Sequence, residues 1–362
     1  MGSIAMRNYG HLQAVLFCWL LLITAPLAKA QTASKIDAVV LDEMYRQGIV
    51  GMAVGIIRDG IIYYARGYGH EDLAKSKPVT TNTVFRWASV SKPLTAAAVL
   101  KIAETDPQFS LNDRVTQYVP YWPQYGDKAD IRLWQLLSHR AGIIHYRTNA
   151  GCFDNPWPDY RLSRYRSHYY NARQSVDIFI DQPLCFTPGA SYKYSTFGYS
   201  LLAAAIEGAT GKSYADWIND NIRQPLAMQS LQQSTATRTG YTMLNRRLIP
   251  IPDDNVSWRL PGGGWESNII DLSKFANAII QERLLKNAER LWAHVPGNHN
   301  YGLGMSHNPD NSFVWHDGHH INSRSLLALF PGSPDRLGIV VLSNSAHSEP
   351  MDIVYRLARL LL

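Results

Sequence analysis

The sequence predicts an α+β fold in which one antiparallel sheet, formed by both chain ends and flanked by helices, surrounds an inserted, mainly helical part. Three observations support this: a pair of β-branched apolar runs near the N-terminus, a second pair near the C-terminus, and helical periodicity between them. Strands that are separated by a run of helices are typical of α+β domains. We expect the sheet to come from about residues 35–85 and 300–362 and the helical part from about 90–295.

The strands are the clearest elements. The predicted pairs are 52–58 with 61–66 and 325–330 with 337–343. Asp59-Gly60 joins the first pair, and this dipeptide supplies the positive φ angles that a two-residue hairpin turn requires. Pro331 and Gly332 interrupt the apolar pattern between the strands of the second pair. We therefore expect the chain after its first thirty residues to open with a β-hairpin.

Apolar residues at three- and four-residue spacing predict the helices. They are expected at 94–104, 133–138, 198–208, 271–285 and 351–361. Asp271 is the expected N-cap of the fourth, because a short acidic side chain can accept a hydrogen bond from the first helical turn. The longest irregular stretch runs from residue 145 to residue 173.

The composition is that of a globular protein. Of the 362 residues, 46% are hydrophobic and 18% are charged, which allows a full core and excludes disordered and fibrous classes. The formal net charge of +6 is scattered along the chain, so we expect no nucleic-acid partner. We also expect no metal and no cofactor.

The first thirty residues resemble a secretory signal peptide. Arg7 gives a positive start, residues 14–22 are apolar, and Ala28-Lys29-Ala30 is a small-x-small cleavage site. The apolar run is short for a membrane span. We therefore expect cleavage before Gln31, one domain over 31–362 without a stable membrane anchor, and export to the periplasm or the cell exterior; a single membrane anchor is the alternative.

Cleavage would also remove Cys18 and leave Cys152 and Cys185. Two cysteines in an oxidising compartment predict a disulfide. Two unrelated buried cysteines are the alternative, because the sequence does not fix the distance between their Cα atoms.

Ser89 and Lys92 stand at the start of a predicted helix. An extended segment precedes Ser89, and Pro93 is tolerated only in a first helical turn, so the helix should begin close to Ser89. At positions i and i+3 the hydroxyl and the amine share one helix face, which lets the amine take a proton from the hydroxyl. A single Ser-x-x-Lys is weak evidence, because a chain of this length contains about one by chance.

Two further motifs make the pattern specific. Tyr194-Ser-Thr196 precedes a predicted helix, and His316-Asp-Gly318 precedes a predicted strand pair. In order and spacing, the three motifs resemble the Ser-x-x-Lys, Tyr-x-Asn and Lys/His-x-Gly motifs of the serine β-lactamase and penicillin-binding-protein superfamily, which includes class C β-lactamases, esterases and D-aminopeptidases. The resemblance covers most of the chain after Gly48 and implies a β-lactamase/transpeptidase-like fold.

The resemblance also implies a serine hydrolase that forms an acyl-enzyme on Ser89. Lys92 would accept the proton of Ser89, which requires an amine kept neutral by burial or by a nearby positive charge. Tyr194 would relay a proton to the leaving group, with Lys92 and His316 lowering the pKa of its phenol.

The remaining implied residues would hold the substrate. The backbone N–H groups of Ser89 and His319 would form the oxyanion hole, and Thr196 and Gly318 would lie beside the substrate. We expect this substrate to be a small molecule or peptide-like.

The sequence departs from the family pattern at two of these positions. Thr196 replaces Asn and loses the amide that can hold a substrate carbonyl, and His319 replaces Gly and narrows the approach to the backbone. Histidine in the third motif, as at His316, is seen in the esterase and D-aminopeptidase branches and carries only a partial charge near neutral pH. We expect an esterase or D-amino-acid peptidase-like enzyme, with a β-lactamase or D,D-carboxypeptidase, or an inactive binding or scaffold protein, as alternatives.

Three other segments look like family motifs but are left out of the predicted site. Tyr169-Tyr-Asn171 lies in the irregular stretch, and we expect no strand pair after Arg238-Thr-Gly240. Ser138-His139 is expected only to close a helix.

Overall fold

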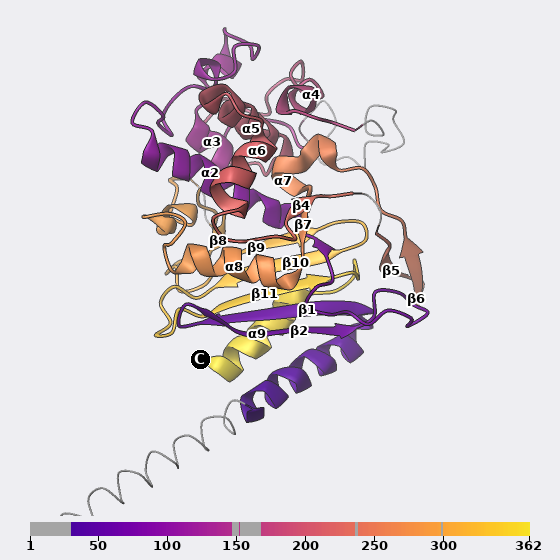
Figure 1. Ribbon diagram of the computed structural model, residues 1–362. Helices are drawn as coiled ribbons and strands as arrows, with labels where there is room; N and C mark the ends of the chain where they lie inside the picture. The colour runs from indigo at the N-terminus through magenta and orange to yellow at the C-terminus, as the bar shows by residue number, and fades with distance from the viewer. Residues whose placement is uncertain (1–29, 147–151, 153–167, 236–237, 298–299) are drawn as a thin grey trace, which may run out of the picture.

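The computed structural model describes residues 30–146, 152, 168–235, 238–297 and 300–362. Its centre is an antiparallel sheet with strands from both chain ends (Figure 1). In this described part six strands form the sheet, in the order β2-β1-β11-β10-β9-β8. Their bounds are β1 Gly51–Arg58, β2 Ile61–Gly69, β8 Ser306–His307, β9 Val314–His319, β10 Arg324–Leu329 and β11 Gly338–Ser343. The predicted fold class is confirmed.

β1 and β11 join the two ends of the chain. They run antiparallel, with Val54 opposite Val341 and Ile56 opposite Ile339. Both strands are buried along almost their whole length, because helices cover both faces of the sheet. The turn at Asp59 and Gly60 has φ angles of 50° and 76°, as the predicted hairpin requires.

The helices form a layer on each face of the sheet (Figure 1). On one face lie α8 (Ile269–Ile280), α2 (Ser91–Thr105) and the rest of the helical part. The other elements of that part are α3 Leu133–Leu137, α4 Ala172–Val176, α5 Thr196–Thr210, α6 Tyr214–Ile218 and α7 Leu260–Gly263. On the opposite face lie α9 (Pro350–Leu361) and a helix over residues 30–47.

The helix over residues 30–47 corrects the expectation that a hairpin opens this part of the chain. Its residues Ile36, Val40 and Met44 are buried in one apolar cluster with residues of α9, including Ile353 and Leu357. Their four-residue spacing puts them on one helix face. The predicted signal peptide lies outside the described residues, and none of the helices within them is long and apolar enough to cross a membrane.

The cap of α8 is also different from the prediction. Asn268, not Asp271, is the N-cap, and its side chain accepts a hydrogen bond from the backbone N–H of Asp271 at 2.9 Å. The carboxylate of Asp271 instead accepts from the backbone and the hydroxyl of Ser230, each at 2.6 Å.

The described residues also include five short strands, β3 to β7, which lie in the sequence between β2 and β8 and form two small sheets. β3 (Phe85–Arg86) and β4 (Gln232–Gln233) pair with β7 (Trp265–Ser267). β5 (Gly240–Leu244) and β6 (Arg247–Ile251) form a hairpin. The expectation that no strand pair follows Arg238 is therefore wrong. The turn between β5 and β6 consists of Asn245 and Arg246, which have φ angles of 48° and 62°. This turn lacks the glycine that marks most two-residue hairpin turns in a sequence.

Candidate active site

Ser89 lies in a 3₁₀ turn, Ala88–Val90, directly before α2. β3 leads into this turn, and the backbone N–H of Trp87 donates to the carbonyl of Trp265 at 2.9 Å. Ala88 has a φ of 45°, a left-handed conformation that is costly for a residue with a side chain. The chain therefore turns sharply before Ser89, which leaves this side chain partly exposed at the start of the helix.

Lys92 is fully buried beside Ser89. Its Nζ lies 3.1 Å from Ser89 Oγ, 3.2 Å from Thr196 Oγ1 and 2.7 Å from the carbonyl oxygen of Gly262. Burial holds the pKa of Lys92 well below its ordinary value, and the charge of Arg259 lowers it further. This shift favours the neutral amine, which is the form that can accept a proton from Ser89.

Tyr194 lies directly before α5, whose first turn is capped by the side chain of Ser195. The hydroxyl of Tyr194 is hydrogen-bonded to the side chain of Ser89, and Lys92 Nζ lies 4.7 Å from the centroid of the Tyr194 ring. Burial raises the pKa of Tyr194 well above its ordinary value, and the bond to Ser89 only partly opposes this.

The expected lowering of the pKa of Tyr194 by Lys92 and His316 is therefore wrong. Burial disfavours the charged forms of these two bases, so they exert little positive field on the phenol. Tyr194 is a protonated phenol that can donate its proton and take another.

His316 is buried in β9. Its Nε2 lies 3.0 Å from the hydroxyl of Tyr301, and its ring centroid lies 6.4 Å from that of Tyr194. Burial lowers the pKa of His316 to about 4, with a further contribution from Lys92. The imidazole is therefore neutral at pH 7.

Gly318 brings β9 against the turn that carries Ser89. A Cβ at this position would lie 2.3 Å from the carbonyl oxygen of Trp87 and 3.2 Å from Ala88 Cβ, so the strand can approach only because residue 318 is glycine. His319 follows, with a half-exposed imidazole 3.1 Å from the carboxylate of Asp317. The oxyanion hole formed by the backbone of Ser89 and His319 stays a prediction.

Thr196 is buried in the first turn of α5. Its Oγ1 contacts Lys92, and its backbone N–H donates to Nδ1 of His145 at 3.2 Å. A Cβ on Gly262 would lie 2.7 Å from Thr196 Cγ2, so α7 and α5 are in close contact here. Thr196 thus keeps a contact with the amine, although it lacks the amide of the family's Asn. Its role beside a substrate stays a prediction.

His139 was left out of the predicted site, but the structure places it there. Its ring centroid lies 4.2 Å from that of Tyr194 and 4.8 Å from that of Tyr301, and its Nδ1 accepts from the N–H of Ser195 at 3.1 Å. Burial holds the pKa of His139 well below its ordinary value, with a contribution from Lys92. The only sequence signal was its place in Leu-Leu-Ser-His-Arg-Ala-Gly-Ile, within the region of resemblance.

Three further residues of the site were not predicted. Tyr301 contacts His316, Gly262 supplies a carbonyl to Lys92, and Arg259 adds a positive charge near that amine. Tyr301 and Gly262 stand in segments that share the family resemblance, which was their only signal.

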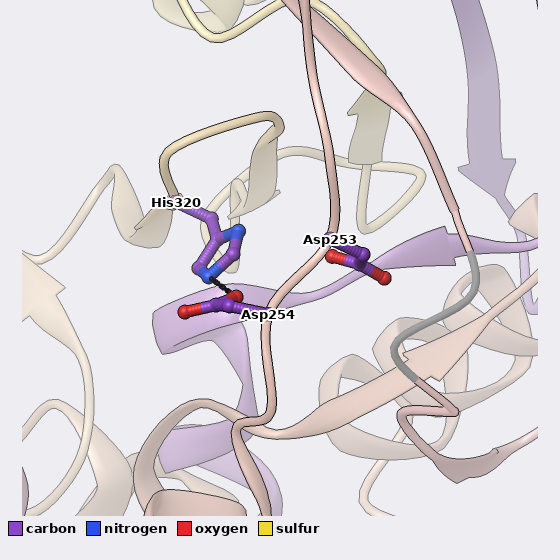
Figure 2. A group of neighbouring side chains, drawn as sticks. All are labelled: Asp253, Asp254 and His320. Carbon is purple, nitrogen blue, oxygen red and sulfur yellow. Dashed lines mark ion pairs between the residues drawn. The ribbon is translucent and has the colours of Figure 1, made fainter. Parts of the chain in front are cut away.

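Asp253, Asp254 and His320 could in principle offer ligands to a metal (Figure 2). Arg86, however, already contacts all three: its Nε lies 2.7 Å from Asp253 Oδ1, and its Nη1 lies 3.0 Å from Asp254 Oδ1 and 3.1 Å from His320 Nε2. This buried guanidinium offsets one of the two carboxylate charges, and Arg259 Nη2 lies 4.0 Å from Asp254 Oδ2. The group fits an ion-pair network that anchors the strand before Ser89 rather than a metal site.

Cys152, in the irregular stretch over residues 145–173, forms a disulfide with Cys185 across a Cα–Cα distance of 5.2 Å. Asn171 caps α4 by accepting a hydrogen bond from the N–H of Gln174 at 3.0 Å. Arg238 pairs with Glu266 at 3.4 Å. Asn171 and Arg238, which belong to the two motif matches left out of the predicted site, thus have structural roles.

Comparison with known proteins identifies the family. The family model Beta-lactamase matches residues 36–362. The human Serine beta-lactamase-like protein LACTB, mitochondrial, is 28% identical over 305 residues, which cover 67% of this chain and 56% of that protein. The chain thus spans about half the length of the curated relatives it matches.

Two solved structures have the same fold. The octameric penicillin-binding protein homologue from Pyrococcus abyssi has a TM-score of 0.75 and 24% identity, over 91% of this chain and 77% of that one. The D-amino acid amidase from Ochrobactrum anthropi SV3 has a TM-score of 0.73 and 20% identity, over 90% of this chain and 99% of that one. Because the family model covers most of its length, the chain belongs to the Beta-lactamase family, a family of serine hydrolases.

Proposed function

We propose that the chain cleaves an ester or a peptide/amide bond through an acyl-enzyme on Ser89. The observation that carries this proposal is the 3.1 Å contact between Lys92 Nζ and Ser89 Oγ, in surroundings that lower the pKa of the amine. A hydroxyl beside a neutral, buried base is the arrangement that nucleophilic catalysis requires.

Acylation follows from these contacts. Ser89 Oγ attacks the carbonyl carbon while its proton passes to Lys92, and the oxyanion is stabilised by backbone N–H groups. When the tetrahedral intermediate collapses, Tyr194 donates its proton to the leaving group and regains one from Lys92. The leaving group departs protonated, and the acyl group stays on Ser89.

Deacylation uses the same groups in reverse. A water molecule attacks the acyl carbon, and Tyr194 passes the proton of that water to Lys92. Collapse of the second intermediate returns a proton to Ser89 Oγ and releases the acid. The high pKa of Tyr194 supports a relay by a protonated phenol rather than by a phenolate.

The neutral imidazole of His316 supports an ester or amino-acid amide rather than a substrate held by its carboxylate. With a pKa of about 4, His316 supplies no fixed positive charge at pH 7. This makes a β-lactamase or D,D-carboxypeptidase the weaker candidate. An inactive scaffold was suggested by Thr196 and His319, but the contact of Thr196 with Lys92 supports an intact catalytic set.

A fluorophosphonate probe tests the proposal directly. The wild type should be labelled, Ser89→Ala should not, and Ser110→Ala, an exposed serine outside the site, should be labelled like the wild type. Turnover of p-nitrophenyl esters, D- and L-amino-acid amides and nitrocefin then ranks the substrate classes. Labelling that persists in Ser89→Ala would move the nucleophile to another residue.

Export from the cytoplasm is part of the proposal. The disulfide between Cys152 and Cys185 supports it, because such bonds persist in oxidising compartments. The N-terminal sequence of the secreted protein, which should begin at Gln31, tests the cleavage site.

A further inference from the structure

Asp317 carries a negative charge on β9, the strand that packs against the turn with Ser89, and the mechanism above does not use it. It stands in β9 between His316, which contacts Tyr301, and Gly318, which packs against Ala88. Because successive side chains of a strand alternate between its faces, the carboxylate of Asp317 leaves β9 on the same face as His319 and opposite to His316 and Gly318. Its charge nevertheless acts on Lys92 and Tyr194. The Asp317 side chain is 52% exposed, whereas His316 is buried.

The strand edge that carries Asp317 is open. Among the described residues, β8 pairs only with Val314 and Trp315 of β9, so the edge from His316 to His319 faces no neighbouring strand. An extended substrate can bind along such an edge through backbone hydrogen bonds. The groups of that substrate next to the scissile bond would then pass close to the carboxylate of Asp317.

Asp317 is ionised, and its charge reaches the site. Partial burial raises its pKa, but the hydrogen bond from His319 and the nearby histidines outweigh this effect and lower the pKa of Asp317 to about 2. Its negative charge raises the pKa of both Lys92 and Tyr194, although burial dominates at both groups. Lys92 and His316 are neutral at pH 7, so neither of these two bases opposes the charge of Asp317, whereas the buried Arg259 acts on Lys92 with the opposite sign.

Two cations near the site are held by other partners. Lys193 donates to the carbonyl of Cys152 at 2.6 Å. Arg259 is buried, and its guanidinium donates to the hydroxyl of Tyr146 at 2.8 Å. Neither contact brings a positive charge onto Asp317.

The site also has an exposed aromatic ring, Tyr192, which the charge of Asp317 reaches. Tyr192 is 41% exposed, and its ring centroid lies 6.2 Å from that of Tyr301 and 5.9 Å from that of His139. Burial, together with the charge of Asp317, raises the pKa of Tyr192 to about 12, so its ring is neutral. A carboxylate and an aromatic face are two kinds of group that bind an ammonium in proteins.

We propose that Asp317 selects substrates that carry a protonated amine next to the scissile bond, such as amino-acid amides or esters with a free α-amino group. This inference rests on the proposed acyl-enzyme function of Ser89. An N-acylated substrate loses the attraction to Asp317, and a carboxylate in the same place is repelled.

The test compares three p-nitroanilides of one amino acid: with a free amine, with an N-acetyl group, and with an N-succinyl group that carries a carboxylate. For a charge pair about 6 Å apart in partly exposed surroundings, Asp317→Asn should lower the amine-to-acetyl ratio of kcat/KM about tenfold. Turnover of the acetyl substrate should stay within about threefold, and Asp317→Lys should favour the succinyl substrate. Asp310→Asn is the matched control, because it removes an exposed carboxylate before the start of β9.

Two failures can be told apart. The first control is the reaction of Ser89 itself, measured with the substrate series and with a benzenesulfonyl fluoride that carries a free or an acetylated aminoethyl group. If none of these compounds reacts in a manner that depends on Ser89, the proposed function itself is wrong. If Ser89-dependent reaction occurs and the amine-to-acetyl ratio is the same in the wild type, Asp317→Asn and Asp317→Lys, the assignment of Asp317 is overturned. A ratio that changes equally in Asp310→Asn would overturn it as well, because the effect would then be one of net charge alone.

Discussion

Replacement of Lys92 by Met tests whether burial removes the proton from this amine. Met has a similar length and no polar head group, so it fills the same space while the contacts with Ser89, Thr196 and Gly262 are lost. In the unfolded chain a lysine is protonated below a pKa of about 10.4, whereas burial holds the pKa of Lys92 well below that value in the folded protein. Between these two pKa values, folding of the wild type releases one proton from Lys92, and folding of the variant does not.

This proton release has a calculable effect on stability. Where the unfolded state binds one proton more than the folded state, the free energy of unfolding rises by about 1.4 kcal/mol per pH unit. The rise extends from the pKa of Lys92 in the folded protein up to about pH 10.4. The stability of Lys92→Met relative to the wild type should therefore fall by about 1.4 kcal/mol per pH unit within that window, because other groups titrate alike in both proteins. The hydrogen bond lost at Gly262 adds a constant cost of about 1 to 3 kcal/mol.

Urea denaturation followed by tryptophan fluorescence at pH 7, 8, 9 and 10, with the disulfide intact, measures the difference. Lys35→Met, which removes an exposed lysine, should follow the wild type at every pH. The catalytic rate of Lys92→Met should fall by at least about a thousandfold, as for other members of a catalytic unit. A stability difference that is constant over this pH range would mean that Lys92 keeps its proton on folding and would refute its role as the base.

Three other variants test separate parts of the site. His316→Lys should raise the kcat/KM ratio of an anionic to a neutral ester by about 1 to 2 kcal/mol, or roughly tenfold, because it adds a fixed positive charge; an unchanged ratio with activity retained would place His316 away from the substrate. Gly318→Ala should lower kcat/KM by roughly a hundredfold with little change in circular dichroism, since its Cβ would lie 2.3 Å from the Trp87 carbonyl, whereas Gly332→Ala, with nothing within 4 Å, should be silent. Replacing both Cys152 and Cys185 by Ala should lower the free energy of unfolding by about 3 to 4 kcal/mol in urea; two free thiols in the denatured, unreduced wild type would contradict the bond.

Local patterns explain which parts of the fold could be predicted. The β1–β2 hairpin follows from two apolar runs and an Asp-Gly turn, all within nineteen positions of the printed sequence. The cap of α8 could not be assigned in this way, because Asn268 and Asp271 both suit an N-cap and only the first lies at the actual helix start. The helix over residues 30–47 was not predicted, although Ile36, Val40 and Met44 have the four-residue spacing of a buried helix face.

In the site, too, contacts between residues close in the sequence could be predicted, and contacts between distant residues could not. Ser89 and Lys92 are three positions apart, so helical geometry alone predicts their contact. His139 reaches Tyr194 across 55 positions and Tyr301 reaches His316 across 15, and these contacts depend on how α3, α5 and β9 pack. The pKa of Tyr194 was assigned the wrong direction for a related reason: burial, its largest cause, is a property of the packed structure.

Burial also determines the charge that a substrate meets, which a count of basic residues does not give. The three motifs and the Ser-His-Arg segment contribute Lys92, His139 and His316, a set that suggests a site for anions. Burial lowers the pKa of all three, so that none offers a full positive charge at pH 7. Asp317 keeps its charge because it is half exposed and bonded to His319. The same burial that gives Ser89 a neutral base therefore removes the positive charges that the motifs suggest, and the proposed substrate preference depends on the ionised carboxylate of Asp317.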